Sequence, residues 1–154
     1  MNSSNNLRLG TAMLTAVAVG YFCVAARADV STTDVPHGRL EDFHWTPLPQ
    51  AGGSEAIIYR SPDGKRVAAA FKESGKVTFT FPFDEFFYVI AGHIKIAVQD
   101  GPTFEVKQGG VGYIKEGQTI YCEFSKDFYG LAYLASDHDT QWPPTDEHPS
   151  GYKK

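Results

Sequence analysis

Nine short segments rich in strand-forming residues follow the Gly52-Gly53 pair, and turn-forming residues separate each segment from the next. Val, Ile, Phe, Tyr and Thr are dense in these segments, and the chain beyond residue 28 shows no helical periodicity with caps. Separators such as Ala91-Gly92 and Asp100-Gly101 are typical of hairpins. Strands this short must close into a barrel or a two-sheet sandwich to hide their edges. The sequence therefore predicts an all-β domain, with strands at residues 55–60, 66–72, 76–81, 85–90, 93–99, 103–106, 111–115, 119–124 and 129–136.

Residues 1–28 have the pattern of a removable signal peptide. Arg8 precedes an apolar run over residues 9–26, and the small-residue triplet Ala26-Arg27-Ala28 follows. The mature chain would start at Asp29 and be exported to the periplasm or the extracellular space. A membrane anchor is the alternative, because a spanning helix needs about 20 predominantly apolar residues. Glycine and threonine residues dilute the run, so cleavage is favoured and we expect no stable membrane insertion afterwards.

The two cysteines of the chain lie far apart. Cys23 falls in the predicted signal peptide, where the bulky Tyr21 and Phe22 before it disfavour a lipid attachment site. Cys122 is then the only cysteine of the mature chain, so no intrachain disulfide can form. It is either a small buried residue of a strand or a reactive thiol, and the first interpretation is favoured.

Charge and length limit the possible functions. Removing residues 1–28 takes away Arg8 and Arg27 and no acid, which leaves 12 basic and 18 acidic side chains and a formal charge of −6. An acidic body argues against nucleic acid as a partner. The remaining length suits one domain. We expect an N-terminal arm at residues 29–50, a barrel at 51–136 and an acidic C-terminal tail at 137–154.

Two motifs carry a resemblance to a known family. Residues 81–92 read Phe-Pro-Phe-Asp-Glu-Phe-Phe-Tyr-Val-Ile-Ala-Gly, with Glu85 seven positions before the hairpin glycine Gly92. Residues 109–117 read Gly-Gly-Val-Gly-Tyr-Ile-Lys-Glu-Gly. In these motifs residues 75–136 resemble the cupins, and among them the small single-domain RmlC-like cupins of the ureidoglycine aminohydrolase and ethanolamine-utilisation type. The resemblance implies a double-stranded β-helix, a jelly-roll barrel of two antiparallel sheets, that pairs into homodimers.

The departures from the family pattern concern its metal site. Metal-bearing cupins carry His-x-His and, after four intervening residues, Glu in the first motif. The histidine positions here hold Thr78 and Thr80, or Phe79 and Phe81 if the register shifts by one. The position of the third histidine holds Ile120, so only Glu85 remains of the four ligands. A transition metal needs three or four converging ligands, and we therefore expect neither a metal nor another cofactor at this site.

Glu85 is the candidate catalytic residue. On the family pattern it points into the barrel, where aromatic surroundings would raise its pKa and suit it to general acid or base catalysis. The alternative is that Glu85 closes the turn at Asp84-Glu85 by accepting hydrogen bonds from backbone amides.

Five hydroxyl side chains are candidate ligand-binding residues. A tyrosine with a buried ring can orient a polar ligand through its hydroxyl group, and threonines at the positions of the metal ligands can face the same cavity. Either kind of residue can equally be an ordinary part of a strand. The candidates are Tyr88, Tyr113, Tyr121, Thr78 and Thr80.

Three functions remain open at this point, as does a structural role in which the barrel is a scaffold and the arm or tail binds another protein. The first is an exported, metal-independent cupin that binds a small polar or carboxylate-bearing molecule in its barrel. The second is a metal-independent isomerase, epimerase or lyase that uses Glu85 and a tyrosine as an acid–base pair. The third is a hydrolase similar to ureidoglycine aminohydrolase, which ranks lower because that chemistry relies on a bound metal.

Overall fold

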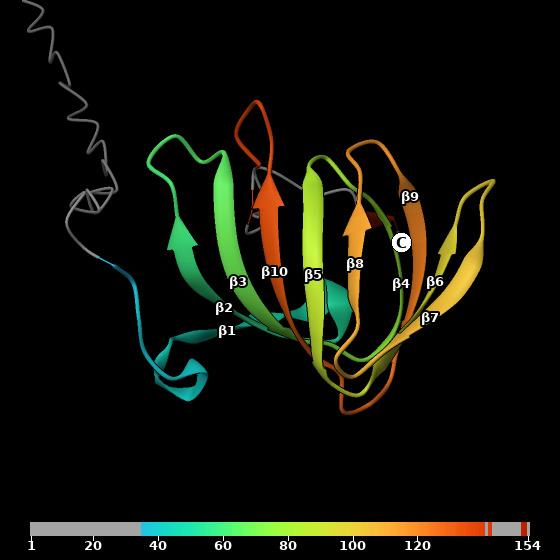
Figure 1. The fold of residues 1–154 in the computed structure, drawn as a ribbon, viewed down its shortest axis with the longest axis horizontal. Coiled ribbons are helices and arrows are strands. Elements are labelled where there is room, and N and C mark those ends of the chain that lie inside the picture. Colours follow the sequence, from blue (N-terminus) through green and yellow to red (C-terminus); the bar gives the residue numbers. More distant parts are fainter. Residues whose placement is uncertain (1–34, 141, 143–151, 154) are drawn as a thin grey trace, which may run out of the picture.

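The chain forms a barrel of two antiparallel β-sheets. The computed structural model describes residues 35–140, residue 142 and the backbone of residues 152–153. One sheet has the strand order β1-β2-β3-β10-β5-β8 and the other β11-β4-β9-β6-β7. Figure 1 shows β2, β3, β10, β5 and β8 side by side, with strands of the second sheet continuing the wall. The strands are β1 (Trp45–Leu48), β2 (Gly53–Arg60), β3 (Arg66–Lys72), β4 (Gly75–Thr80), β5 (Asp84–Ala91), β6 (His93–Val98), β7 (Thr103–Lys107), β8 (Val111–Ile114), β9 (Thr119–Phe124), β10 (Tyr129–Ala135) and β11 (Tyr152–Lys153).

The predicted fold class, an all-β double-stranded β-helix, is confirmed. Each of the nine predicted segments coincides with one of the strands β2 to β10 to within two residues at either end. The described residues add strands β1 and β11 and two single-turn 3-10 helices, Leu40–Asp42 and Pro49–Ala51. The predicted signal peptide, residues 1–28, lies outside the described residues. No helix in the described part of the chain is long and apolar enough to cross a membrane.

Alternation along the strands separates the interior of the barrel from its surface. In β9 Ile120, Cys122 and Phe124 are buried, whereas Tyr121 and Glu123 between them are exposed. This follows from the two-residue period of a strand, in which successive side chains point to opposite faces of the sheet. The same alternation in the other strands gives the barrel an interior of aromatic and aliphatic side chains.

Two glycines are required by the local geometry. Gly92 connects β5 to β6 with a φ of +68°, and a Cβ there would lie 2.3 Å from Ser125 Oγ. Gly112 pairs with Phe87 across β8 and β5, and a Cβ at this position would lie 2.3 Å from the phenylalanine ring. At position 92 only glycine can adopt the left-handed backbone conformation without a clash of its side chain with Ser125. In the second, glycine leaves room for a ring that faces the barrel interior.

The folded unit extends beyond residues 51–136 at both ends. On the N-terminal side, β1 pairs with β2, and the Trp45 ring lies 6.0 Å from the Tyr129 ring and 4.3 Å from Lys72 Nζ. On the C-terminal side, Thr140 Oγ1 donates a hydrogen bond to the carbonyl oxygen of Gly64 at 2.9 Å. Parts of the predicted arm and tail therefore belong to the barrel, because each supplies buried or paired residues.

Candidate functional site

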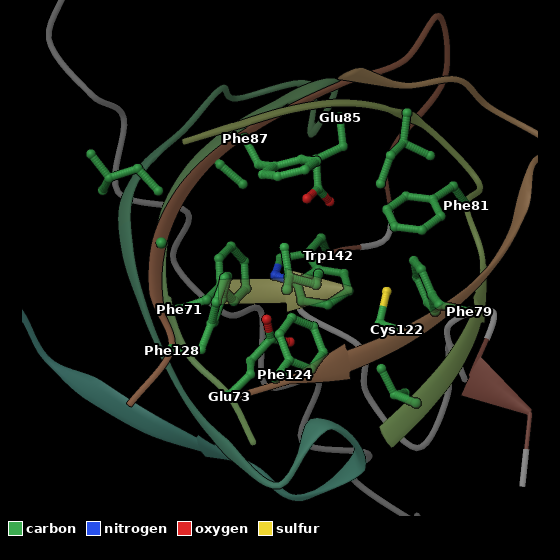
Figure 2. A pocket seen from close by; sticks show the side chains of 16 residues that line it. Phe71, Glu73, Phe79, Phe81, Glu85, Phe87, Cys122, Phe124, Phe128 and Trp142 are labelled. Carbon is green, nitrogen blue, oxygen red and sulfur yellow. The ribbon is translucent and has the colours of Figure 1, made fainter. Parts of the chain in front are cut away.

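A cavity lies inside the barrel between the two sheets. The space open to the centre of a water molecule is about 60 Å³. Because one water needs roughly 10–15 Å³ by this measure, the cavity has room for about four to six water-sized groups. Seven aromatic side chains contribute to its wall (Figure 2): Phe71, Phe79, Phe81, Phe87, Phe124, Phe128 and Trp142.

Two carboxyl groups extend into this aromatic cavity. Glu85 is carried by β5, and Glu73 follows the end of β3. Figure 2 shows the two side chains on opposite sides of the cavity, with the Trp142 indole between them. Both glutamates are half-buried. The functional interpretation of Glu85, a carboxyl group inside the barrel, thus agrees with its position.

The surroundings shift the pKa of both glutamates upward. Burial among apolar groups disfavours the charged carboxylate and raises the pKa of Glu85 to about 8. Burial also raises the pKa of Glu73 well above its usual range, and the negative charges of Glu85 and Glu55 raise it further. Neither glutamate forms an ion pair or a hydrogen bond within the described part of the chain. At neutral pH these surroundings therefore favour at least one protonated carboxyl group.

Asp84, and not Glu85, accepts the hydrogen bonds that close the turn at Asp84-Glu85. Asp84 Oδ1 accepts a hydrogen bond from the backbone N–H of Glu116 at 2.8 Å, and Asp84 Oδ2 accepts one from the Tyr113 hydroxyl at 2.8 Å. These bonds hold the pKa of Asp84 below its usual value. Asp84 thus links the start of β5 to β8 and to the turn that follows it, whereas Glu85 faces the cavity.

A third carboxyl group, that of Glu55, holds the cavity wall in place. Glu55 on β2 is only 2% exposed, and its Oε2 accepts a hydrogen bond from Trp142 Nε1 at 2.8 Å. Burial raises the pKa of Glu55, and the hydrogen bond from the indole partly offsets that effect. The Trp142 ring also packs edge-on against Phe71 and Phe79, at 5.8 and 6.1 Å between centroids. Trp142 is therefore fixed between the two glutamates by a polar contact and by aromatic packing.

Cys122 contributes its sulfur atom to the cavity wall. It lies on β9 as a buried strand residue, as predicted. Burial raises the pKa of its thiol strongly, and the nearby Glu73 and Glu85 charges add to the effect. Because the thiolate is the nucleophilic form, these surroundings argue against a reactive cysteine.

The two candidate threonines lie elsewhere. Thr78 and Thr80 do not line the cavity, and Thr80 Oγ1 is 2.9 Å from Thr119 Oγ1 in a hydrogen bond on the neighbouring strand. Phe79 and Phe81, the residues of the shifted register, line it instead. The period of the strand explains this, since residues on either side of an inward-facing side chain face outward. The threonines are therefore not part of the candidate site.

The three candidate tyrosines lie on the outer surface of the barrel. Tyr88 is 39% exposed, Tyr113 59% and Tyr121 48%, and none of the three lines the cavity. Each follows or precedes an inward-facing residue, such as Phe87 before Tyr88 and Cys122 after Tyr121. The cavity therefore offers aromatic surface without the predicted tyrosine hydroxyls.

Sequence reasoning missed three residues of this region: Glu55, Glu73 and Trp142. Glu73 is a single acid before the Ser74-Gly75 turn, and no local pattern marks it. Trp142 stands in the charged, proline-rich end of the chain that we predicted to be a tail. A large isolated apolar residue in such a segment is the one indication that could have suggested a buried position.

The described residues do not fit a transition-metal site. Such a metal needs three or four imidazole, carboxylate or thiolate ligands that converge on one point. Among the residues described, no group of three or more His, Cys, Asp or Glu side chains has that arrangement. Glu73 and Glu85 approach the cavity from opposite sides, and no described histidine lines it.

Comparisons with known proteins agree with this fold. Residues 60–129 match the family model of the EutQ-like cupin domain. A putative ethanolamine utilization protein Q from Salmonella typhimurium is similar with a TM-score of 0.50 and 20% identity over 59% of this chain and 76% of that one. None of the curated proteins matches the chain.

Two further solved structures share the architecture at lower identity. Ectoine synthase from P. lautus has a TM-score of 0.57 at 13% identity and covers 64% of this chain and 76% of its own. An RmlC-like cupin from Shewanella frigidimarina has a TM-score of 0.55 at 9% identity, and the match covers 66% of this chain and 91% of that one. Identities this low establish the fold and not the activity. The described residues therefore have the fold of the cupins, a double-stranded β-helix, and residues 60–129 match the model of the EutQ-like cupin domain.

Proposed function

We propose that this cupin binds a small polar molecule in its barrel without a transition metal. The observation that supports the proposal is a cavity in which two glutamates face each other across aromatic walls, and neither carboxyl group has a hydrogen-bond or ion-pair partner among the described residues. Ligand sites combine a mostly apolar wall with a few polar groups that orient the ligand. The volume of about 60 Å³ limits the ligand to a few heavy atoms.

The charge of the cavity narrows the predicted ligand class. A carboxylate-bearing ligand, one of the two predicted options, would add a negative charge beside Glu73 and Glu85. No Lys, Arg or His side chain is among the described residues that line the cavity. Like charges in a site of low polarity repel strongly. The proposal therefore retains the small polar molecule and sets the carboxylate-bearing molecule aside.

A thermal-denaturation experiment tests the proposal. The chelator-treated protein is screened against small neutral, cationic and anionic molecules, alongside Ala132→Leu, which adds a larger side chain at a position that lines the cavity. A ligand at ten or more times its Kd is expected to raise the Tm by at least about 4 °C. Ala132→Leu should lose the response, and the control Ala135→Leu on the same strand should keep it.

The same screen can contradict the proposal. A response that requires added transition metal would exclude metal-independent binding. If no molecule raises the Tm, and both leucine variants fold like the unaltered protein, the cavity would be a packing defect of the barrel.

A metal-independent isomerase, epimerase or lyase is the second candidate. It is favoured by the pKa of about 8 for Glu85, because an acid–base catalyst works best with a pKa near the working pH. Glu73 replaces tyrosine as the second group of the pair, since no predicted tyrosine lines the cavity. Turnover of a screened ligand that disappears in Glu85→Gln, with binding retained, would support catalysis. Equal turnover in that variant would remove it.

We also propose that the protein is exported and forms a homodimer. Export rests on the signal-peptide pattern of residues 1–28, and the dimer rests on the family resemblance. Mass spectrometry of the protein from its host should find a chain starting at Asp29, and sedimentation should give the mass of two chains. An intact N-terminus or a monomer at high concentration would contradict the respective proposal.

A further inference from the structure

The interior of the barrel carries more negative than positive groups. Glu55, Glu73 and Glu85 lie close enough for the charges of the first and third to raise the pKa of the second. None of the ion pairs among the described residues involves these three glutamates. A carboxylate that is removed from water without a partner is costly, so a bound proton or a positive charge stabilises it. Glu55 already accepts a hydrogen bond from Trp142, which leaves the other two.

The walls around these two carboxyl groups suit a cation. The negative faces of aromatic rings attract ammonium groups, and the attraction increases where water is excluded. Seven such rings line this cavity, and Trp142, the best of the ring types for this contact, lies between Glu73 and Glu85. An anion would meet the same faces unfavourably. The ring faces and the carboxylates thus both favour a positively charged ligand.

The volume and hydrogen-bonding capacity define the ligand further. Space for about four to six water-sized groups suits an amine with a short alkyl part. A primary ammonium group has three N–H donors and can donate hydrogen bonds to a carboxylate that extends into the cavity. Its alkyl part can then lie against the phenylalanine rings, whereas a quaternary ammonium ion would leave the carboxylates without donors.

We infer that the ligand of this cavity is a small primary ammonium ion, held between Glu73 and Glu85 and surrounded by the aromatic walls. The inference rests on the proposed binding function and specifies the class of its ligand. Glu73 and Glu85 supply the charge and accept the N–H hydrogen bonds, and Trp142, positioned by Glu55, supplies a ring face. The positive charge of the ammonium ion stabilises the carboxylates in the way that a bound proton otherwise would.

Calorimetric titration with three molecules of similar shape tests the inference. Propylammonium, 1-propanol and propionate differ mainly in charge, and all are used with the chelator-treated full chain at equal ionic strength. Propylammonium is expected to bind at least about tenfold more tightly than 1-propanol, while propionate gives no binding. Glu85→Gln and Glu73→Gln should each weaken propylammonium binding at least about tenfold. Glu116→Gln, which removes an exposed carboxyl group, should leave it unchanged.

The outcomes separate this inference from the function on which it rests. Equal binding of propylammonium and 1-propanol, or tighter binding of propionate, would overturn the ammonium ligand and leave small-molecule binding intact. No binding of any of the three, together with no response in the thermal screen, would overturn both. If either glutamine variant fails to fold, the comparison of the three ligands on the unaltered chain still decides.

Discussion

Phe83→Ala is expected to lower the free energy of unfolding by about 3–5 kcal/mol, as for other large-to-small substitutions of a buried phenylalanine. Phe83 lies in the connection between β4 and β5 and is 1% exposed. Its ring centroid is 5.9 Å from that of Trp142, 5.9 Å from that of Phe81 and 6.1 Å from that of Phe79. Removal of the ring would leave a hole beside three aromatic groups that also line the cavity. Urea denaturation followed by circular dichroism measures the change.

Phe86→Ala is the matched control for this substitution. Phe86 lies three residues further along, on β5, and is 45% exposed on the outer face of the sheet. Because little of its surface is buried, we expect a loss of less than about 1 kcal/mol. Equal losses for the two variants would show that the connection between β4 and β5 does not pack against the cavity wall.

The free energy of unfolding is expected to fall as the pH rises from about 5 to about 9. Glu85 has a pKa of about 8 in the folded protein, above the usual value of 4.5 that it regains on unfolding. The unfolded chain therefore loses this proton first, and the destabilisation is absent below pH 4.5, grows through the interval and is complete above pH 8. At 1.36 kcal/mol per pH unit the loss has an upper limit of about 5 kcal/mol. Glu73 and Glu55 act in the same direction, because their pKa values are also raised.

Denaturation curves at several pH values test this dependence. Glu85→Gln should flatten the decline between pH 5 and pH 9 and exceed the unaltered protein in stability at pH 9. Glu116→Gln removes a carboxyl group at the surface and should preserve the decline. Asp84, whose pKa is lowered, affects stability only at the acidic end, where its protonation breaks the bonds to Glu116 and Tyr113. If Glu85→Gln shows the same decline in stability between pH 5 and pH 9 as the unaltered protein, the Glu85 carboxyl group must be exposed to water in the folded protein.

Much of the fold could be predicted from local sequence patterns. Turn residues such as Ala91-Gly92 mark strand ends directly, because the left-handed backbone of Gly92 admits few other residues. The register within a strand was harder to predict. Both alternating sets of β4 contain plausible inward residues, Thr78 and Thr80 or Val77 and Phe79, and only packing against the other sheet selects the second set.

The composition of the candidate site could be predicted only in part. The inward position of Glu85 is implied by the family resemblance, in which a Glu seven positions before the hairpin glycine points into the barrel. Glu73 and Trp142 reach the cavity through contacts that are distant in sequence, such as the hydrogen bond from Trp142 to Glu55. No periodicity records such a contact. The sequence also does not show that the predicted tyrosines lie outside the cavity, because an exposed aromatic residue of a barrel strand has the same local pattern as a buried one.

Metal content is the measurement that tests the central claim most directly. The mature chain from Asp29 is produced without a histidine tag, purified without chelators and analysed for transition metals per mole of folded protein. A cavity formed by aromatic rings and two opposed carboxyl groups predicts a content far below one ion per chain. A content close to one ion per chain that is lost in Glu85→Gln would contradict the proposal, because the cavity would then hold a metal site.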